Sequence, residues 1–130
     1  MAAIVSHSNP STVRPPTGYT HAVEVRTPDR RLVMAGQVGI ALDGLIAEGG
    51  EAQIAQVFTN LREILRANGM TPANLVKITV FLTDPSLIGA YRFERDRFLG
   101  GATPPASTLL FVAGLADPRY MVEVEGEAVA

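Results

Sequence analysis

The sequence predicts an α+β fold in which a mixed β-sheet carries two helices on one face. Three observations favour this fold. Residues 51–68 repeat apolar side chains at helical spacing, residues 75–83 alternate apolar and polar side chains, and a strand pattern closes the chain at 120–129. The expected element order is β-β-β-α-β-α-β-β, with helices and strands mixed along the chain.

The composition fits one globular domain spanning residues 1–130. Apolar residues make up 47% and charged residues 18% of the chain, which excludes a disordered protein. The absence of cysteine excludes thiol catalysis and thiolate metal sites.

The charge pattern argues against a nucleic-acid partner. The formal net charge is −2, Lys77 is the only lysine, and no basic run could neutralise several phosphates. We also find no signal-peptide pattern at the N-terminus and no apolar run approaching the roughly 20 residues of a membrane span. We therefore expect a cytoplasmic protein with no membrane partner.

The first third of the chain is expected to be extended. Residues 1–18 are rich in proline, serine and threonine and predict an arm without periodic structure. Strands are expected at 21–26 and 31–35, joined by a hairpin turn at 27–30, and a third strand at 37–42.

The helix over 51–68 is predicted most clearly. Its apolar stripe consists of Ile54, Val57, Phe58, Leu61, Ile64 and Leu65. Gly69 is expected to end it as a left-handed cap. A second helix is expected from Ser86, acting as N-cap, to Leu99.

The strand over 75–83 presents two different faces. Val76, Ile78, Val80 and Leu82 are expected to face the helices, and Lys77, Thr79, Phe81 and Thr83 the opposite side. The last two strands are expected at 107–113 and 120–129. Because helices would cover only one face of this sheet, we expect the other face to be covered in an oligomer.

Three glutamates share one face of the last strand. Glu123, Glu125 and Glu127 are two residues apart, so their side chains project the same way. Like charges on one face repel unless water or a cation separates them. This face is therefore either solvated or part of a site.

Several segments, taken together and in order over residues 17–129, resemble the RidA/YjgF (L-PSP) family of enamine and imine deaminases. They are Gly18-Tyr19-Thr20-His21-Ala22-Val23, Ala35-Gly36-Gln37, Val57-Phe58-Thr59-Asn60-Leu61, Val76 to Asp84, Pro105-Ala106-Ser107-Thr108 and Val122-Glu123-Val124-Glu125. The resemblance implies a chorismate-mutase-like α+β fold and a homotrimer with a central β-barrel and ligand clefts between subunits. It also implies hydrolysis of a reactive 2-enamine or 2-imine acid to a keto acid and ammonia, without a cofactor.

The resemblance also implies roles for particular residues. Glu123 matches the catalytic glutamate that binds the attacking water. In the alternative interpretation, Glu123 is a solvated carboxylate on the strand. Tyr19 matches a tyrosine of the cleft, or else pins the arm to the body. Gly36 would offer backbone N–H groups to a ligand, or else permits close packing.

The sequence departs from the family at the Pro-Ala-Arg-Ser turn, where arginine would bind the substrate carboxylate. Ser107 stands at that position, with Thr108 after it, and a serine offers one neutral hydroxyl. This argues for a substrate other than a simple 2-imino acid. Arg92 lies about where the family has a cleft asparagine, so Arg92, or Arg95 on the same helix, could supply the missing charge.

Other kinds of site are disfavoured. His7 and His21 are too far apart and the carboxylates too scattered to predict a metal site. No Gly-x-Ser-x-Gly pattern supports a nucleophilic serine. Two alternatives to the enzyme stay open: a trimeric module that only binds a metabolite, and an RNA-cleaving translation inhibitor, which the acidic balance disfavours.

Overall fold

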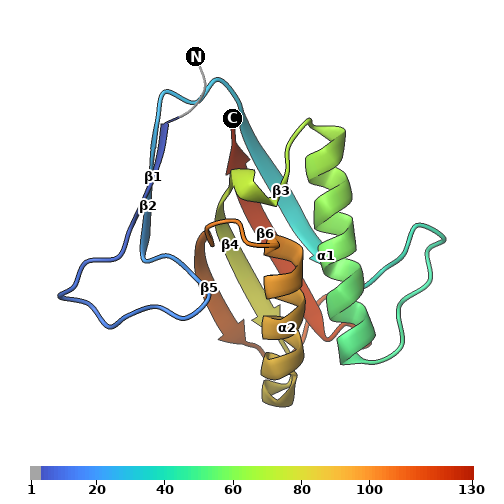
Figure 1. Ribbon diagram of the computed structural model, residues 1–130. Coiled ribbons are helices and arrows are strands. Elements are labelled where there is room, and N and C mark those ends of the chain that lie inside the picture. Colours follow the sequence, from blue (N-terminus) through green and yellow to red (C-terminus); the bar gives the residue numbers. More distant parts are fainter. Residues whose placement is uncertain (1–3) are drawn as a thin grey trace.

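The computed structural model describes residues 4–130 as a four-stranded sheet with two helices on one face and a projecting two-stranded arm (Figure 1). The main elements are β1 (Ile4–Ser8), β2 (Ala22–Arg26), β3 (Arg31–Val38), α1 (Gly50–Ala67), β4 (Leu75–Leu82), α2 (Ile88–Leu99), β5 (Ala106–Phe111) and β6 (Val122–Val129). Short 3-10 turns at Pro72–Asn74 and Pro85–Leu87 precede β4 and α2. The predicted α+β fold is confirmed.

The strands of the main sheet lie in the order β3-β6-β4-β5. β4 and β5 are parallel, whereas β6 runs antiparallel to both β3 and β4. A parallel pair needs a long crossover, and α2 provides it between β4 and β5. This connection places α2 directly over the start of β5.

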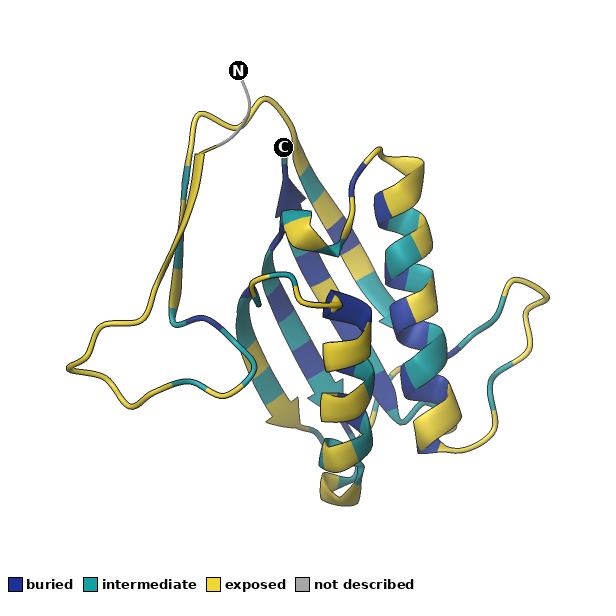
Figure 2. Cartoon of the chain, viewed as in Figure 1, coloured by how far each residue is buried: buried dark blue, intermediate teal, exposed yellow. Residues whose placement is uncertain are grey.

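One face of the sheet forms the core together with both helices, as expected. The stripe of α1 that includes Ile54, Leu61 and Leu65 is fully buried, and it packs against side chains such as Val80 and Val124 from the centre of the sheet. Figure 2 shows the buried residues on the inward side of both helices. At the start of β4, a register shift brings Leu75 into the core in place of the expected Val76.

The helix ends follow local chemistry. Gly69 has a φ of 69°, and the N–H groups of Gly69 and Met70 donate to the carbonyls of Arg66 and Leu65, which confirms the left-handed cap after α1. The predicted Ser86 cap is wrong. Asp84 caps the preceding 3-10 turn by accepting from the N–H of Ser86 at 2.9 Å, and α2 begins two residues later.

The predicted hairpin between residues 21–26 and 31–35 is wrong. β2 pairs with β1, with Ser8 opposite Ala22, so the arm expected to lack periodic structure contains a strand. Residues 31–35 and 37–42 are likewise not separate strands, because β3 runs through 31–38 with one irregularity. The chain enters β3 through two backbone hydrogen bonds between Arg30 and Ala130, and Thr27, with a φ of 48°, turns β2 outward.

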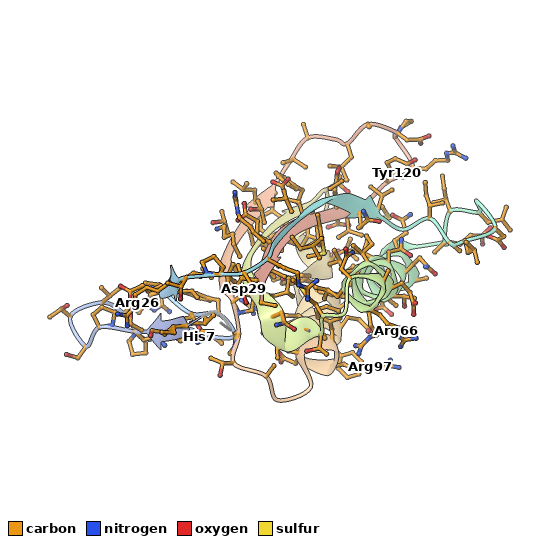
Figure 3. The ribbon with its side chains drawn as sticks, turned by 90° about the horizontal axis from the view of Figure 1, so that it is seen from above. His7, Arg26, Asp29, Arg66, Arg97 and Tyr120 are labelled. Carbon is orange, nitrogen blue, oxygen red and sulfur yellow. The ribbon has the colours of Figure 1, made fainter. Side chains whose placement is uncertain are left out.

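The arm stands away from the body. Seen from above, His7 and Arg26 lie far from the helices that carry Arg66 and Arg97 (Figure 3). β1 is exposed along its whole length, and a lone two-stranded ribbon is only marginally stable. The root of the arm, residues 17–21, is anchored through buried Thr20, whose N–H and hydroxyl donate to the carbonyls of Pro105 and Pro104. The root is therefore fixed beside the start of β5.

The second face of the sheet carries no helix, and we call it the open face. Val33 on β3 is 64% exposed and Leu110 on β5 is 44% exposed. Exposed apolar side chains on a bare sheet are consistent with the expected oligomer, which stays a prediction.

Close packing of α1 on Gly39 generates the first prediction. A Cβ atom at Gly39 would lie 2.7 Å from the Cα of Gln53, which is backbone and cannot rotate away. Gly39→Ala should therefore lower the free energy of unfolding by about 1–3 kcal/mol, measured by urea denaturation. Gly89→Ala is the matched control, because Gly89 lies in α2 with open space around it. The control should match the wild type or gain up to about 1 kcal/mol, and equal stability of all three proteins would contradict this packing.

Candidate functional site

A pocket of about 160 Å³ lies between the root of the arm, α2 and the start of β5. We call it the edge pocket, because β5 is an edge strand of the sheet. It is lined by Thr17, Tyr19, Ile88, Tyr91, Arg92, Arg95, Ser107 and Leu109. Four residues singled out from the sequence therefore come together: Tyr19, Arg92, Arg95 and Ser107.

The pairing of β5 with β4 directs Ser107 into this pocket. Ser107 lies opposite Ile78, and Leu109 lies opposite Val80. Both partners on β4 belong to the core, so Ser107 and Leu109 also face α2.

The arm root holds Tyr19 at the pocket wall. Its neighbour Thr20 is anchored at Pro104 and Pro105, and its ring meets the ring of His21 edge-on, with centroids 5.3 Å apart. The Nε2 atom of His21 lies 2.6 Å from the carbonyl oxygen of Arg14. His21 supports the root and does not line the pocket.

The buried cation of the pocket is Arg95, whereas Arg92 is exposed at the rim. Arg95 is only 8% exposed, and its guanidinium carbon lies 5.8 Å from the centroid of the Tyr91 ring. Its Nε donates to Oδ1 of Asp96 at 2.9 Å, and no other hydrogen-bond partner for it occurs within residues 4–130. The sequence places Arg92 and Arg95 on one helix face but does not distinguish the buried one.

Gly18 allows the arm root to lie against this guanidinium. A Cβ atom at position 18 would lie 2.1 Å from Nη2 of Arg95, and the φ of Gly18 is +73°. The backbone conformation favours glycine, and a side chain at position 18 would displace the guanidinium from its present place.

Tyr91 adds a second buried polar group. It is 2% exposed, and within the described part of the chain its hydroxyl lacks a hydrogen bond of ordinary geometry. Burial raises the pKa of Tyr91 to about 12, and the charge of Arg95 and the nearby hydroxyl of Ser107 offset part of that rise. The Tyr91 hydroxyl stays protonated at neutral pH and is available to donate.

Glu123 lies on the open face, and the edge pocket lies on the opposite face of the sheet. It is opposite Phe81 on β4 and Val38 on β3, and its neighbours Val122 and Val124 face the core. A Cβ atom at Gly36 would lie 2.4 Å from Oε2 of Glu123, so Gly36 leaves room for this carboxylate.

The other open-face residues have structural partners. Glu127 pairs with Arg31 at 2.9 Å, and Lys77 donates through Nζ to the hydroxyl of Thr108 at 2.7 Å. Glu125 is exposed and Glu123 and Glu127 are partly exposed, so the three glutamates share one face, as the alternation predicts. Thr108 thus points away from the edge pocket that holds Ser107.

The residues singled out from the sequence therefore fall into two groups on opposite faces of the sheet. Tyr19, Arg92 and Ser107 line the edge pocket, and Gly36, Thr108 and Glu123 lie on the open face. Within one chain the sheet separates the two groups.

A larger hollow, of about 670 Å³, lies between the loops around Ala47 and Arg119. Its polar groups are already engaged. The Gln53 side chain bonds to the backbone of Arg119 and Met121, and the guanidinium of Arg119 is paired with Asp117. Without a free buried polar group, this hollow is the weaker candidate for chemistry.

Residues 4–130 contain no cluster of three or more histidine, cysteine, aspartate or glutamate side chains that could hold a metal ion. No helix in this part of the chain is long and apolar enough to cross a membrane.

Comparison with known proteins identifies the family. Residues 10–130 match the family described as Endoribonuclease L-PSP. The chain belongs to this family. A RutC family protein of Aquifex aeolicus is 37% identical to this chain, and the match covers 86% of both proteins. The 2-iminobutanoate/2-iminopropanoate deaminase of Mus musculus is also 37% identical, and the match covers 92% of this chain and 88% of the mouse protein.

Solved structures agree with the L-PSP fold. The Rid family protein YyfB of Yersinia pestis, whose function is described as unknown, superposes with a TM-score of 0.89 at 34% identity, covering 97% of this chain and 98% of its own. RidA of an Antarctic Psychrobacter gives a TM-score of 0.73 at 29% identity, covering 90% of this chain and 92% of its own. The RidA/YjgF resemblance is thereby confirmed, and the match to YyfB extends over the arm.

The unpaired hydroxyl of Tyr91 generates the second prediction. The pKa of Tyr91 is about 12 in the folded chain and 10.0 ordinarily, so folding favours its neutral form. This contribution is complete below pH 10 and is lost as the pH rises towards 12. The wild type should therefore lose about 1–1.5 kcal/mol of stability relative to Tyr91→Phe by pH 11, and about 2–3 kcal/mol once the pH passes 12.

At pH 7 the phenylalanine variant should be as stable as the wild type or up to about 1 kcal/mol more stable, since it loses no hydrogen bond. Urea denaturation at pH 7, 9, 10 and 11 measures both effects. Parallel stability curves would contradict the raised pKa of Tyr91, and a large loss at pH 7 would show that its hydroxyl has a partner in the folded chain.

Proposed function

We propose that the chain forms a cytoplasmic homotrimer in which the edge pocket of one copy meets the open face of the next, and that this shared cleft hydrolyses the C=N bond of a small metabolite. The observation that carries the proposal is the division of the site between two faces. Tyr19 and Ser107 can share a ligand with Glu123 only if they come from different copies. A cyclic arrangement that joins two different faces closes into a ring, which fits a trimer.

The proposed chemistry needs only water and a proton carrier. Water adds to the carbon of the C=N bond, and Glu123 takes a proton from it and returns it to the nitrogen. The resulting carbinolamine collapses to a carbonyl compound and ammonia. Water supplies the oxygen of the product, so the step is balanced without an oxidant, reductant or cofactor.

Relatives support this type of reaction. The mouse relative is named 2-iminobutanoate/2-iminopropanoate deaminase, as is a Rattus norvegicus relative that is 34% identical over 85% of this chain. Gly36 supports the role of Glu123, because it leaves space for the carboxylate. An RNA substrate is not favoured, since Glu123, Glu125 and Glu127 place negative charge on the open face.

Complementation between two inactive variants provides the third prediction. Ser107→Trp fills the edge pocket and Glu123→Gln removes the carboxylate, so each variant alone should lose nearly all turnover of freshly generated 2-iminobutanoate. If the two halves come from different copies, unfolding and refolding an equal mixture should restore about a quarter of the wild-type activity, because a quarter of the clefts then combine two intact halves.

A refolded wild-type sample and each refolded variant alone serve as controls. An active wild type with no gain in the mixture would place both halves in one copy. A wild type without turnover of any C=N compound would leave a binding module and end the enzymatic proposal.

A further inference from the structure

We propose that Arg95 on α2 binds the carboxylate of the ligand in the edge pocket, from beneath the root of the arm. This inference rests on the proposed function for the reaction, and it adds the chemical class of the ligand: a small monocarboxylic acid with a polar group next to its carboxylate. The cation then comes from the helix, whereas the turn offers only Ser107. A helix cation would restore a simple 2-imino acid as a substrate, which the turn sequence alone argues against.

The charge of Arg95 is only partly paired within the chain. Arg95 is 8% exposed, yet its partner Asp96 has a side chain that is 66% exposed and engages only Nε. The terminal nitrogens have no hydrogen-bond partner among residues 4–130, and they belong to a residue that lines the edge pocket. These nitrogens carry four of the five N–H groups and can donate to a carboxylate in bidentate geometry. A ligand carboxylate would complete this pairing.

The hydroxyl of Tyr91 is a second polar group directed at the pocket. Tyr91 and Ser107 both line the edge pocket, and the Tyr91 hydroxyl forms no hydrogen bond of ordinary geometry with a described residue, although the Ser107 hydroxyl lies close enough to lower the pKa of Tyr91. A buried donor without a partner is unusual and costs stability. An oxygen or nitrogen next to the carboxylate of a ligand would accept from this hydroxyl.

The edge pocket is small. A volume of about 160 Å³ corresponds to about five water molecules at roughly 30 Å³ each. That space suits an acid of a few carbons rather than a nucleotide or a peptide. The apolar walls, Ile88 and Leu109, suit a short alkyl chain.

Gly18 leaves space for the guanidinium. A methyl group at position 18 would overlap Nη2 of Arg95, so the side chain occupies the volume that any other residue at this position would fill. The guanidinium therefore lies close to both the arm root and the ring of Tyr91. A side chain with little room to move loses less entropy when a ligand binds.

The test uses 2-oxobutanoate, a stable acid of this class, and its uncharged amide, 2-oxobutanamide, in titration calorimetry with the intact wild-type protein. The wild type should bind the acid at least tenfold more tightly than the amide. Arg95→Met should weaken binding of the acid by about 10- to 100-fold and leave the amide nearly unchanged. Arg97→Met is the matched control, because Arg97 lies at the outer surface of α2 with a side chain that is 72% exposed, and it should bind as the wild type does.

A double variant separates a ligand contact from a merely structural role. Ser107→Arg in the Arg95→Met background puts a guanidinium back at the pocket from the turn, and it should recover most of the lost affinity for the acid. Lost affinity with no recovery, in a variant whose circular dichroism is unchanged, would overturn the proposal. So would a wild type that binds the acid and the amide equally, or binds neither.

The calorimetry does not depend on turnover. Selective acid binding through Arg95 in a protein that hydrolyses no C=N compound would retain this inference and remove the proposed function. Turnover of a C=N compound that Arg95→Met leaves unchanged would retain the proposed function and overturn the role of Arg95.

Discussion

The helices described between residues 4 and 130 cover only one face of the sheet, and this constraint determines where every candidate site residue lies. Because side chains alternate along a strand, the residues of β5 and β6 divide between the helix face and the open face. Ser107 falls on the first and Glu123 on the second. A site that uses both can exist only where two copies meet, so assembly and chemistry depend on the same strand register.

The arm root is the second determinant of the site. Hydrogen bonds from Thr20 to the turn at Pro104 and Pro105 bring Tyr19 to the pocket, and Gly18 lets the backbone lie on Arg95. The exposed ribbon beyond the root makes no comparable contact with its own sheet. The part of the arm that matters for the pocket is thus its base, where the chain passes the start of β5.

Sequence patterns within a few residues correctly predicted several elements that depend on neighbouring residues of the chain. The apolar stripe of α1, its Gly69 cap and the alternation along β4 from Ile78 onward are encoded within a few residues, and the structure has them where expected. The segments that resemble the L-PSP family likewise indicated Tyr19 and Ser107, which do share a pocket.

The errors arise where the partner of a segment is distant in sequence. Residues 27–30 have turn chemistry that suits a hairpin, but β2 pairs with β1, and the chain enters β3 alongside Ala130. The sequence of α2 also conceals its inner face, because Arg95 is 8% exposed while Phe93 is 66% exposed. A polar residue inside and an aromatic residue outside reverse the usual pattern, so periodicity alone could not select Arg95.

The most direct measurement is a crystal structure of the assembled protein grown with 2-oxobutanoate. The Glu123 carboxylate should lie in one cleft with Ser107 of a neighbouring copy and nearer to it than to Ser107 of its own chain, with the ligand carboxylate on Arg95. A monomer, or an assembly in which Glu123 faces bulk solvent, would contradict the shared cleft.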